Sequence, residues 1–421
     1  MSDIAKTTAL DLSPYGALEQ FLRKRLLAQM GQLRESRLVL DDALGTEEVG
    51  DPLGDANSLR SQITVRDPAF YRAVAANGSV GSAEAWMDGH WDCDDLVSLV
   101  RMLVRNRDLL DGMETGIARL GGLAMRAWNA MRRNTRDGSR RNIAAHYDLG
   151  NDFFRLFLSE DLMYSSALFE NAEESLEIAS RRKLDAICTQ LALKPDDHVI
   201  EIGTGWGGFA VHAAKHYGCR VTTTTISREQ HALASERIAA AGLGDRVTLL
   251  LQDYRDLSGH YDKLVSIEMV EAIGHQYIDT YFAKLGNLLK PDGLALVQAI
   301  TIEDHRYEQA LRSVDFIKRY IFPGSFIPSV SALLGAMGRA SDLGLVRMHD
   351  FGMSYALTLR AWRQRFLAHL PEVRALGYDE RFLRMWEFYL AYCEGGFLER
   401  SIGVAHLLMA KPRWTGAGGS S

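Results

Sequence analysis

The sequence predicts an α/β protein in which helices cover both faces of a parallel sheet, with a smaller domain at the N-terminus. From residue 175 onward, segments with helical periodicity alternate with short apolar segments typical of strands. The segment VIEIGTGWGGF at 199–209 breaks from an apolar run into glycines, as a strand does when it turns into a helix. The chain has 421 residues, more than one compact core usually organises, so two domains are expected.

The N-terminal part has a weaker pattern of its own. Leu18 and Phe21 begin a helical spacing, and strand-like segments follow at 37–40 and 61–65. These features predict a small mixed domain over residues 1–115, whose chemistry the pattern does not reveal.

Residues 119–141 combine basic and apolar side chains. Seven arginines lie there, at positions 119, 126, 132, 133, 136, 140 and 141. The only acid is Asp137, and apolar residues such as Leu120 and Trp128 recur at helical spacing. Such a helix can lie on an anionic lipid surface. A linker helix docked on protein, with solvated arginines, explains the pattern equally well, and both interpretations stay open for the linker at 116–142.

Composition narrows the class of protein. Hydrophobic residues make up 47% of the chain and charged residues 24%, as in ordinary globular proteins. A net charge of -6 argues against a dedicated nucleic-acid binder, which would be basic. The four cysteines show no metal-binding spacing, so we expect no metal. They also fit a protein of a reducing compartment. No signal peptide and no apolar run of ~18 residues is evident, which predicts a cytoplasmic protein that meets a membrane only from its side.

The alternation after residue 175 gives the order of the elements in the larger domain. Helices are expected at 175–192, 207–216, 228–241 and 276–289, and strands at 197–202, 220–226, 246–252, 261–267 and 293–302. Ligands of such sheets bind at the carboxyl ends of the strands, where Glu201, Thr225, Asp253 and Glu271 fall. A helical region rich in aromatic residues follows residue 303, and it could either fill the core or wall an apolar pocket.

The glycine turn has the spacing Gly203-x-Gly205-x-x-Gly208, which also fits the dinucleotide fingerprint. A nicotinamide site needs an acid at the end of the second strand to hold the ribose, but that strand ends in Ser227 and a basic residue. Glu201 ends the first strand, where it could attract the ammonium of an amino-acid-bearing cofactor such as S-adenosylmethionine. The residues therefore favour a site for a methyl donor. A nicotinamide-dependent dehydrogenase is a poor alternative.

Nine segments match one known family in order. They are GSVGSAEAWMDGHWDCDDL (78–96), AAHYDLGNDFFRLFL (144–158), MYSSALF (163–169), EIGTGWGGFA (201–210), TISREQ (225–230), DYRDL (253–257), VEAIG (270–274), IFPGSFIPS (321–329) and YLAYCEGGF (389–397). Over most of 65–412 the chain resembles the cyclopropane fatty acid synthases and mycolic acid cyclopropane synthases, which use S-adenosylmethionine.

The resemblance sharpens the domain prediction. It implies a Rossmann-like class I methyltransferase fold over residues 143–412, followed by a flexible tail at 413–421. The smaller domain at 1–115 would then be lipid-binding-like.

The resemblance also implies the residues that bind S-adenosylmethionine. With Glu201 and the glycine turn included, they are Tyr164, Ser165, Glu201, Gly203, Gly205, Gly207, Thr225, Gln230, Asp253 and Tyr254. Thr225 and Gln230 can supply the ribose hydrogen bonds, and Asp253 can accept from the adenine amino group. The alternative for Thr225 and Gln230 is a helix cap and a surface residue.

In the family, the π bond of a cis-unsaturated acyl chain attacks the sulfonium methyl, and a base then removes a proton from the added methyl so that a ring closes. The resemblance implies a bound bicarbonate as that base. Glu271 and Tyr355 are retained to hold it, and Ile300 can supply the backbone amide. The family cysteine is Ser166 here and the family histidine is Gln298.

Both replacements can form hydrogen bonds, so an anion or water could still be held. Glutamine cannot titrate, however, so the site loses a proton relay. A weaker base would let the carbocation shift a hydride and lose another proton, which gives a methyl-branched or methylene-bearing chain. Glu271 could alternatively be a helix N-cap or a core ion pair.

The resemblance implies a one-carbon transfer to the cis double bond of acyl chains in phospholipids, by an enzyme at the inner face of the membrane. The partners expected are the bilayer and a second copy of the chain in a homodimer, with no nucleic acid. The alternatives are a methyltransferase without ring closure, a small-molecule methyltransferase and a catalytically silent lipid-binding relative.

Overall fold

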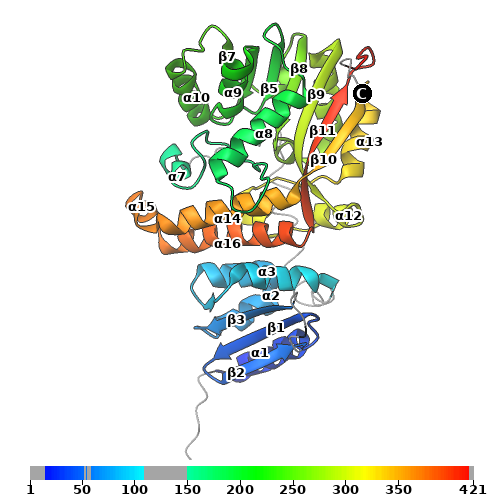
Figure 1. The fold of residues 1–421 in the computed structure, drawn as a ribbon. Helices are drawn as coiled ribbons and strands as arrows, with labels where there is room; N and C mark the ends of the chain where they lie inside the picture. The colour runs from blue at the N-terminus through cyan, green and yellow to red at the C-terminus, as the bar shows by residue number, and fades with distance from the viewer. Residues whose placement is uncertain (1–14, 52–53, 55–57, 109–148, 417–421) are drawn as a thin grey trace, which may run out of the picture. The chain divides into compact units, whose positions relative to one another are not determined.

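A computed structural model of the chain describes residues 15–51, 54, 58–108 and 149–416, which fall into two compact units, Met1–Gly121 and Gly122–Ser421 (Figure 1). Each unit is described by itself. The basic segment at 119–141, the linker at 116–142 and the last five residues of the tail lie outside the described residues.

The first unit contains a four-stranded sheet. Its strands are β1 (Ser36–Asp42), β2 (Gly45–Gly50), β3 (Leu59–Val65) and β4 (Trp91–Cys93), in the order β2-β1-β3-β4, and its helices are α1 (Ala17–Met30), α2 (Ala69–Met87) and α3 (Leu96–Arg105). The strands predicted at 37–40 and 61–65 are confirmed, but those at β2 and β4 were not predicted. Helix α1 leaves Leu18 and Phe21 more than half exposed, at 55% and 56%, so its apolar residues do not all face the core.

The second unit contains a seven-stranded sheet in the order β10-β11-β9-β8-β5-β6-β7. Its strands are β5 (His198–Ile202), β6 (Arg220–Thr225), β7 (Val247–Leu251), β8 (Tyr261–Ile267), β9 (Leu289–Ile302), β10 (Gly344–Asp350) and β11 (Ile402–Ala410). All five strands that the sequence predicts are confirmed, and they pair in parallel.

The sheet is mixed, which the sequence did not predict. Strand β11 pairs antiparallel with β9 along its whole length and antiparallel with β10, and Figure 1 shows these three strands side by side. Strand β9 is buried from residue 293 to 299, so the polar N–H and C=O groups on its free side need hydrogen-bond partners, and the distant segment β11 supplies them. The prediction of a purely parallel sheet is therefore wrong on this side.

The helices of the second unit lie between and beyond these strands. They are α7 (Asn151–Arg155), α8 (Leu176–Gln190), α9 (Gly208–Tyr217), α10 (Arg228–Ala240), α11 (Ile278–Leu288), α12 (Asp304–Arg312), α13 (Val330–Ala340), α14 (Gly352–Ala368), α15 (Leu370–Ala375) and α16 (Glu380–Leu398), with short helical turns at Tyr254–Asp256, Val270–Ala272, His275–Tyr277 and Ile317–Ile321. The four helices predicted between the strands are confirmed within three residues at each end. No helix among the described residues is long and apolar enough to cross a bilayer.

Two apolar cores occupy the two faces of the large sheet. Val199 and Val265 pack with α8 and α9 in one core, whereas their neighbours Ile200 and Leu264 pack with α11 and α13 in the other. Successive side chains of a strand point to opposite faces, so helices cover both faces of the sheet. The doubly wound α/β prediction is thereby confirmed, and α14 and α16 pack side by side as an addition to it (Figure 1).

Candidate active site

The glycine turn lies where the sequence places it, between β5 and α9. Gly203, Gly205 and Gly207 have φ angles of 98°, 52° and 85°, in the left-handed region that favours glycine. A β-carbon at Gly205 would meet no atom within 4 Å, so the turn leaves open space on that side. At Gly208 it would lie 2.5 Å from the Met163 sulfur. Gly208 is therefore required by protein packing rather than by the approach of a ligand.

Glu201 is buried at the carboxyl end of β5. Its Oε2 accepts a hydrogen bond of 2.6 Å from Thr223 Oγ1, and only 2% of the residue is exposed. Burial raises the pKa of Glu201 to about 8, because a lone carboxylate loses its hydration there. A cation such as the ammonium of S-adenosylmethionine would stabilise the ionised form, so this carboxyl group fits the cofactor that the sequence predicts.

Thr225 and Gln230 are joined at the end of β6. Thr225 Oγ1 donates a hydrogen bond of 2.8 Å to Gln230 Oε1, and both residues are buried. The cap of α10 is Ser227, whose side chain accepts from the Gln230 backbone N–H. The alternative of a cap at Thr225 and a surface position for Gln230 is therefore wrong. Their contact with a ribose stays a prediction.

Asp253 and Tyr254 follow β7. Both carboxylate oxygens of Asp253 accept from the Arg255 guanidinium, at 2.9 and 2.7 Å. Tyr254 packs edge-on against Tyr281 and, among the described residues, its hydroxyl has no hydrogen-bond partner. A carboxylate oxygen has more than one acceptor direction, so the adenine contact of Asp253 stays a prediction.

Lys183 on α8 is a member of the site that the sequence prediction missed. It is 0% exposed, and its Nζ donates a hydrogen bond of 2.8 Å to Ser165 Oγ. Burial lowers the pKa of Lys183 to about 8, while the charges of Asp161, Glu268 and Glu201 act in the opposite direction. The signal was present in the sequence, because Lys183 falls at the apolar spacing of the predicted helix.

Glu268, another residue that the sequence prediction missed, is the point on which the predicted catalytic residues converge. Its Oε1 accepts from the Ser166 backbone N–H at 2.9 Å and from Gln298 Nε2 at 2.7 Å. Its Oε2 accepts from the Tyr355 hydroxyl at 2.7 Å. Three of the five residues expected to hold an anion therefore hold a carboxylate of the chain itself.

The role of Ser166 differs from the prediction. Its hydroxyl donates to the carbonyl of Ala167, so only its main-chain N–H reaches the carboxylate of Glu268. In this structure the serine hydroxyl is therefore not directed at Glu268, and its ability to hold an anion or water stays a prediction. A serine at this position satisfies its hydroxyl locally, as short polar side chains often do.

Gln298 is held in one orientation by a buried chain of hydrogen bonds. Because its amide N–H₂ donates to Glu268, its Oε1 must accept, and His406 Nε2 lies 3.0 Å from it. Gln190 Nε2 lies 2.9 Å from His406 Nδ1, which then accepts. Burial lowers the pKa of His406 to about 3, in agreement with this neutral form. Nothing in the local sequence links β9 to β11, so His406 was not predicted.

Glu271 completes the cluster. Its Oε1 accepts from the Ile300 backbone N–H at 2.5 Å, so the amide that the resemblance assigns to a bound anion donates to Glu271 in this structure. Its Oε2 is buried and has no hydrogen-bond partner among the described residues. Burial and the nearby charge of Glu268 raise the pKa of Glu271 to about 8. This environment does not fit a helix cap or a core ion pair, the alternatives left open by the sequence.

The backbone of Glu268 is in the left-handed region, with φ of 48°. This conformation costs a residue other than glycine roughly 1–3 kcal/mol, so it persists only where the surroundings enforce it. Such positions cluster at functional sites.

The aromatic region after residue 303 divides between core and site. Phe326 belongs to the core beneath α11, and Phe316 packs against Phe388. Phe322 instead lies near Tyr164 and Tyr389, with ring centroids 6.4 and 6.1 Å away. The hydroxyls of Tyr164 and Tyr389 are 2.9 Å apart, so this aromatic surface borders a predicted cofactor residue. The core interpretation is thus confirmed for Phe316 and Phe326, and a pocket wall at Phe322 stays a prediction.

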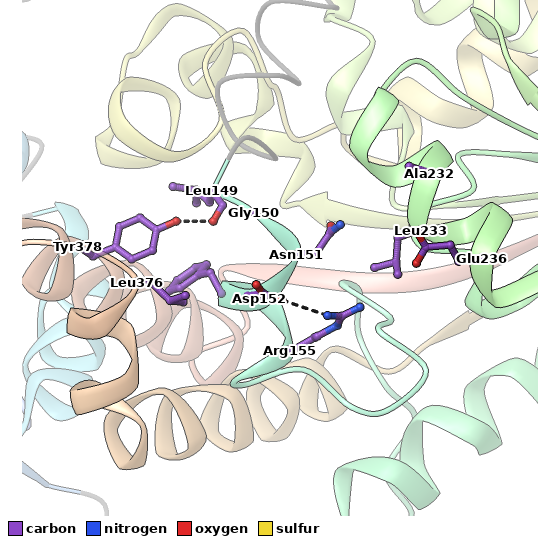
Figure 2. Close-up of a pocket in the computed structure, with 11 residues that line it drawn as sticks. Leu149, Gly150, Asn151, Asp152, Arg155, Ala232, Leu233, Glu236, Leu376 and Tyr378 are labelled. Atoms are coloured by element: carbon purple, nitrogen blue, oxygen red, sulfur yellow. Dashed lines mark hydrogen bonds and ion pairs between the residues drawn. The ribbon is translucent and has the colours of Figure 1, made fainter. Parts of the chain in front are cut away.

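A cavity of about 490 Å³ lies beside α7, α10 and α15 (Figure 2). It is lined by Leu149, Gly150, Asn151, Asp152, Phe153, Arg155, Ala232, Leu233, Glu236, Leu376 and Tyr378. It contains none of the predicted site residues. It adjoins the glycine turn through Asn151, whose Oδ1 accepts a hydrogen bond of 2.7 Å from the Trp206 indole.

Comparison with known proteins identifies the group to which the chain belongs. Residues 134–407 match the mycolic acid cyclopropane synthetase family. The chain is 37% identical to the tuberculostearic acid methyltransferase of Mycobacterium tuberculosis, over 91% of this chain and 90% of that protein. It is 38% identical to the cyclopropane-fatty-acyl-phospholipid synthase of Escherichia coli K12, over 84% of this chain and 89% of that protein.

Solved structures give the same result. The mycolic acid cyclopropane synthase CmaA1 complexed with SAH and CTAB superposes with a TM-score of 0.61 at 29% identity, over 65% of this chain and 98% of that one. The cyclopropane synthase MmaA2 from Mycobacterium tuberculosis gives 0.60 at the same identity, over 65% and 98%. The chain belongs to the mycolic acid cyclopropane synthetase family and is an S-adenosylmethionine-dependent methyltransferase.

Proposed function

We propose that the enzyme transfers the methyl group of S-adenosylmethionine to the cis double bond of an unsaturated fatty acyl chain in a phospholipid. The observation that carries this proposal is the cluster of Glu268 and Glu271, held by backbone amides, Gln298 and Tyr355. Methylation of a carbon–carbon double bond leaves a carbocation that must lose a proton, and a carboxylate with a raised pKa can accept one. The names of the two curated relatives described above, which concern fatty acyl substrates, support the same substrate class.

The aromatic surface beside this cluster suits the same substrate. Phe322, Tyr164 and Tyr389 present rings close to a predicted cofactor residue. Aromatic faces carry partial negative charge, so they stabilise a nearby cation without capturing it as water would. An acyl chain also needs apolar walls.

We further propose that the enzyme works from the cytoplasmic face of the membrane. The arginine-rich segment at 119–141 would bind anionic headgroups, and α1 adds exposed Leu18 and Phe21 beside the basic Lys24 and Arg25. These groups match the chemistry of a lipid surface, in which apolar side chains enter the headgroup boundary while basic ones pair with phosphate.

A second candidate product follows from Ser166 and Gln298. Neither residue supplies a titratable side chain, so the proton relay that the resemblance implies is absent. If the proton leaves from another carbon, or the cation shifts before deprotonation, the product is a methylene-bearing or methyl-substituted alkene instead of a cyclopropane.

Acyl-chain analysis tests the proposed function. A host that lacks such enzymes would express the protein and receive methyl-labelled methionine, and its lipids would be analysed by mass spectrometry and proton NMR. Ring protons would identify a cyclopropane, whereas a labelled methylene or methyl branch without ring protons would identify the second candidate. The absence of label from every lipid would contradict the proposed substrate class.

Liposome binding tests the membrane proposal separately. Substituting glutamine for the arginines at 132, 133, 136, 140 and 141 should weaken binding to anionic vesicles, and salt should weaken binding of the unchanged enzyme. A double change of Leu18→Ser and Phe21→Ser should weaken binding at every salt concentration. Unchanged vesicle binding in both variants would support the alternative that residues 119–141 are a linker helix docked on protein.

A further inference from the structure

We propose that the side-chain carboxylate of Glu268 is the catalytic base, in the position for which family resemblance implies a bound bicarbonate. The proposal rests on the proposed function and deepens it, because it names the group that takes the proton from the methylated acyl chain. It also makes the enzyme independent of bicarbonate.

The first argument is the set of donors around Glu268. Ser166, Gln298 and Tyr355 are three of the five residues expected to hold an external anion, and all three donate to this one carboxylate at 2.7–2.9 Å. Each carboxylate oxygen has at least one donor, and the three donors come from separate parts of the chain. A bicarbonate that used the same donors would have to displace the carboxylate.

The second argument concerns access. Ser166, Gln298 and Tyr355 are buried, whereas Glu268 is only partly buried. Glu268 as a residue is thus more exposed than the residues that donate to it. Its left-handed backbone persists there at a conformational cost, as is common at functional positions.

The third argument is the division of charge between the two glutamates. Glu268 accepts three hydrogen bonds, which favour its ionised form, whereas Glu271 accepts only one and leaves Oε2 without a partner among the described residues. Burial and the negative charge of Glu268 raise the pKa of Glu271. Burial raises the pKa of Glu268 as well, which suits a group that must accept a proton, but its three hydrogen bonds oppose that shift. We therefore assign the proton of the pair to Glu271 and the role of acceptor to Glu268.

The reaction balances with these groups. The π electrons of the acyl chain form a bond to the methyl carbon, and the sulfur–methyl bond breaks with its electron pair remaining on sulfur. Glu268 removes one proton from the transferred methyl, and the electrons of that C–H bond close the ring or, after a hydride shift, form a methylene double bond. The proton passes to solvent after product release, so no oxidant, reductant or additional anion is needed.

The first test uses the unchanged enzyme with vesicles of phosphatidylglycerol that carry cis-octadec-9-enoyl chains. Turnover in buffer depleted of carbon dioxide should stay within about twofold of turnover with added bicarbonate. Loss of activity on depletion, with recovery on adding bicarbonate, would overturn the proposal. This measurement requires no variant, so a folding defect cannot obscure it.

The second test compares two isosteric variants. Glu268→Gln should lower turnover by about 100-fold or more, the range of a lost general base, while the Kd of S-adenosylmethionine changes less than about threefold. Glu271→Gln should cost much less, about tenfold, because an amide resembles the protonated carboxyl that Glu271 carries. Equal losses in the two variants would contradict the division of roles.

The third test is chemical rescue. Glu268→Gly relieves the left-handed backbone and removes the carboxylate, so formate or bicarbonate should restore turnover in a saturable way. No restoration by either anion, in a variant that still binds S-adenosylmethionine, would overturn the proposal.

Methyl-tritiated S-adenosylmethionine gives a direct readout, since proton removal from the methyl releases tritium to water. Failure of the proposed function and failure of this inference are distinguishable. If the unchanged enzyme labels no lipid, the proposed function fails. If it labels lipid but Glu268→Gln does so equally well, only the assignment of the base fails.

Discussion

The predicted cofactor side and the proposed base side of the candidate active site are built in different ways. The cofactor side comes from consecutive segments, the glycine turn after β5 and the end of β6, where Glu201 and Thr225 lie within 25 residues of each other. The base side joins Ser166, Glu268, Gln298 and Tyr355 from four separate segments. A local motif can thus specify a generic methyl-donor site, whereas the chemistry done with the methyl group depends on long-range contacts.

Among the changes that test this difference between the two sides of the site, removal of the Glu271 side chain should have the largest effect on turnover. Glu271→Ala deletes the acceptor of the Ile300 amide and the group that shares a proton with Glu268. We expect turnover to fall by about 100-fold or more, with the Kd of S-adenosylmethionine changed less than about threefold. Rate measurements and calorimetric titration on the same preparation would show this split.

The exposed Glu173→Ala provides a matched control for this change, because it removes a glutamate side chain at a solvent-facing position. Loss of cofactor binding in Glu271→Ala would move Glu271 to the cofactor side and remove the distinction between the two halves of the site.

This comparison also explains how much the sequence could predict. The glycine turn, Glu201 and the five parallel strands follow from local patterns, and resemblance places Glu271, Tyr355 and Ile300. Glu268 was overlooked because the residues that surround it are 30 to 102 positions away in the chain. His406 and the antiparallel β11 were missed for the same reason, since pairing between β9 and β11 has no local signature.

The next largest effect should be the pH dependence of S-adenosylmethionine binding beside Glu201. The pKa of Glu201 is raised from an ordinary 4.5 to about 8, so the group is protonated at pH 6.5 in the free enzyme. Binding of an ammonium should release that proton, and the affinity for S-adenosylmethionine should rise up to about tenfold per pH unit until about pH 8. Calorimetry in buffers of different ionisation enthalpy would measure the released proton.

The same pKa shift predicts a change in stability. Because the folded-state pKa lies above its unfolded value, the protonated carboxyl stabilises the fold fully below about pH 4.5, and this contribution is lost as the pH rises through about 8. Glu201→Gln should flatten the fall in Tm over that range and abolish the proton release. A release that persisted in the variant would assign the proton to another group, such as the buried Glu271.

A smaller effect should follow from removing a hydrogen bond that supports the glycine turn. Asn151→Ala removes the acceptor of the Trp206 indole beside the cavity in Figure 2, a hydrogen bond of about 0.5–1.5 kcal/mol. Trp206 lies inside the turn, so the Kd of S-adenosylmethionine should rise about three- to tenfold while the response to bicarbonate stays the same. Asp152→Ala, on the same short helix, is the control, because it breaks an exposed ion pair with Arg155. Equal effects of both variants would point to α7 as a whole.

The smallest effect should come from the contact that links the cofactor side to the aromatic surface. Tyr389→Phe keeps the ring but removes the hydroxyl that lies 2.9 Å from the Tyr164 hydroxyl. We expect a two- to threefold rise in the Kd of S-adenosylmethionine, about 0.5 kcal/mol, and a similar change in turnover, because Tyr164 stays packed against Trp362. Tyr307→Phe on α12 is the matched control. A loss of turnover without a change in Kd would place this tyrosine pair on the base side, so that the boundary between the two halves would run through the cofactor residues themselves.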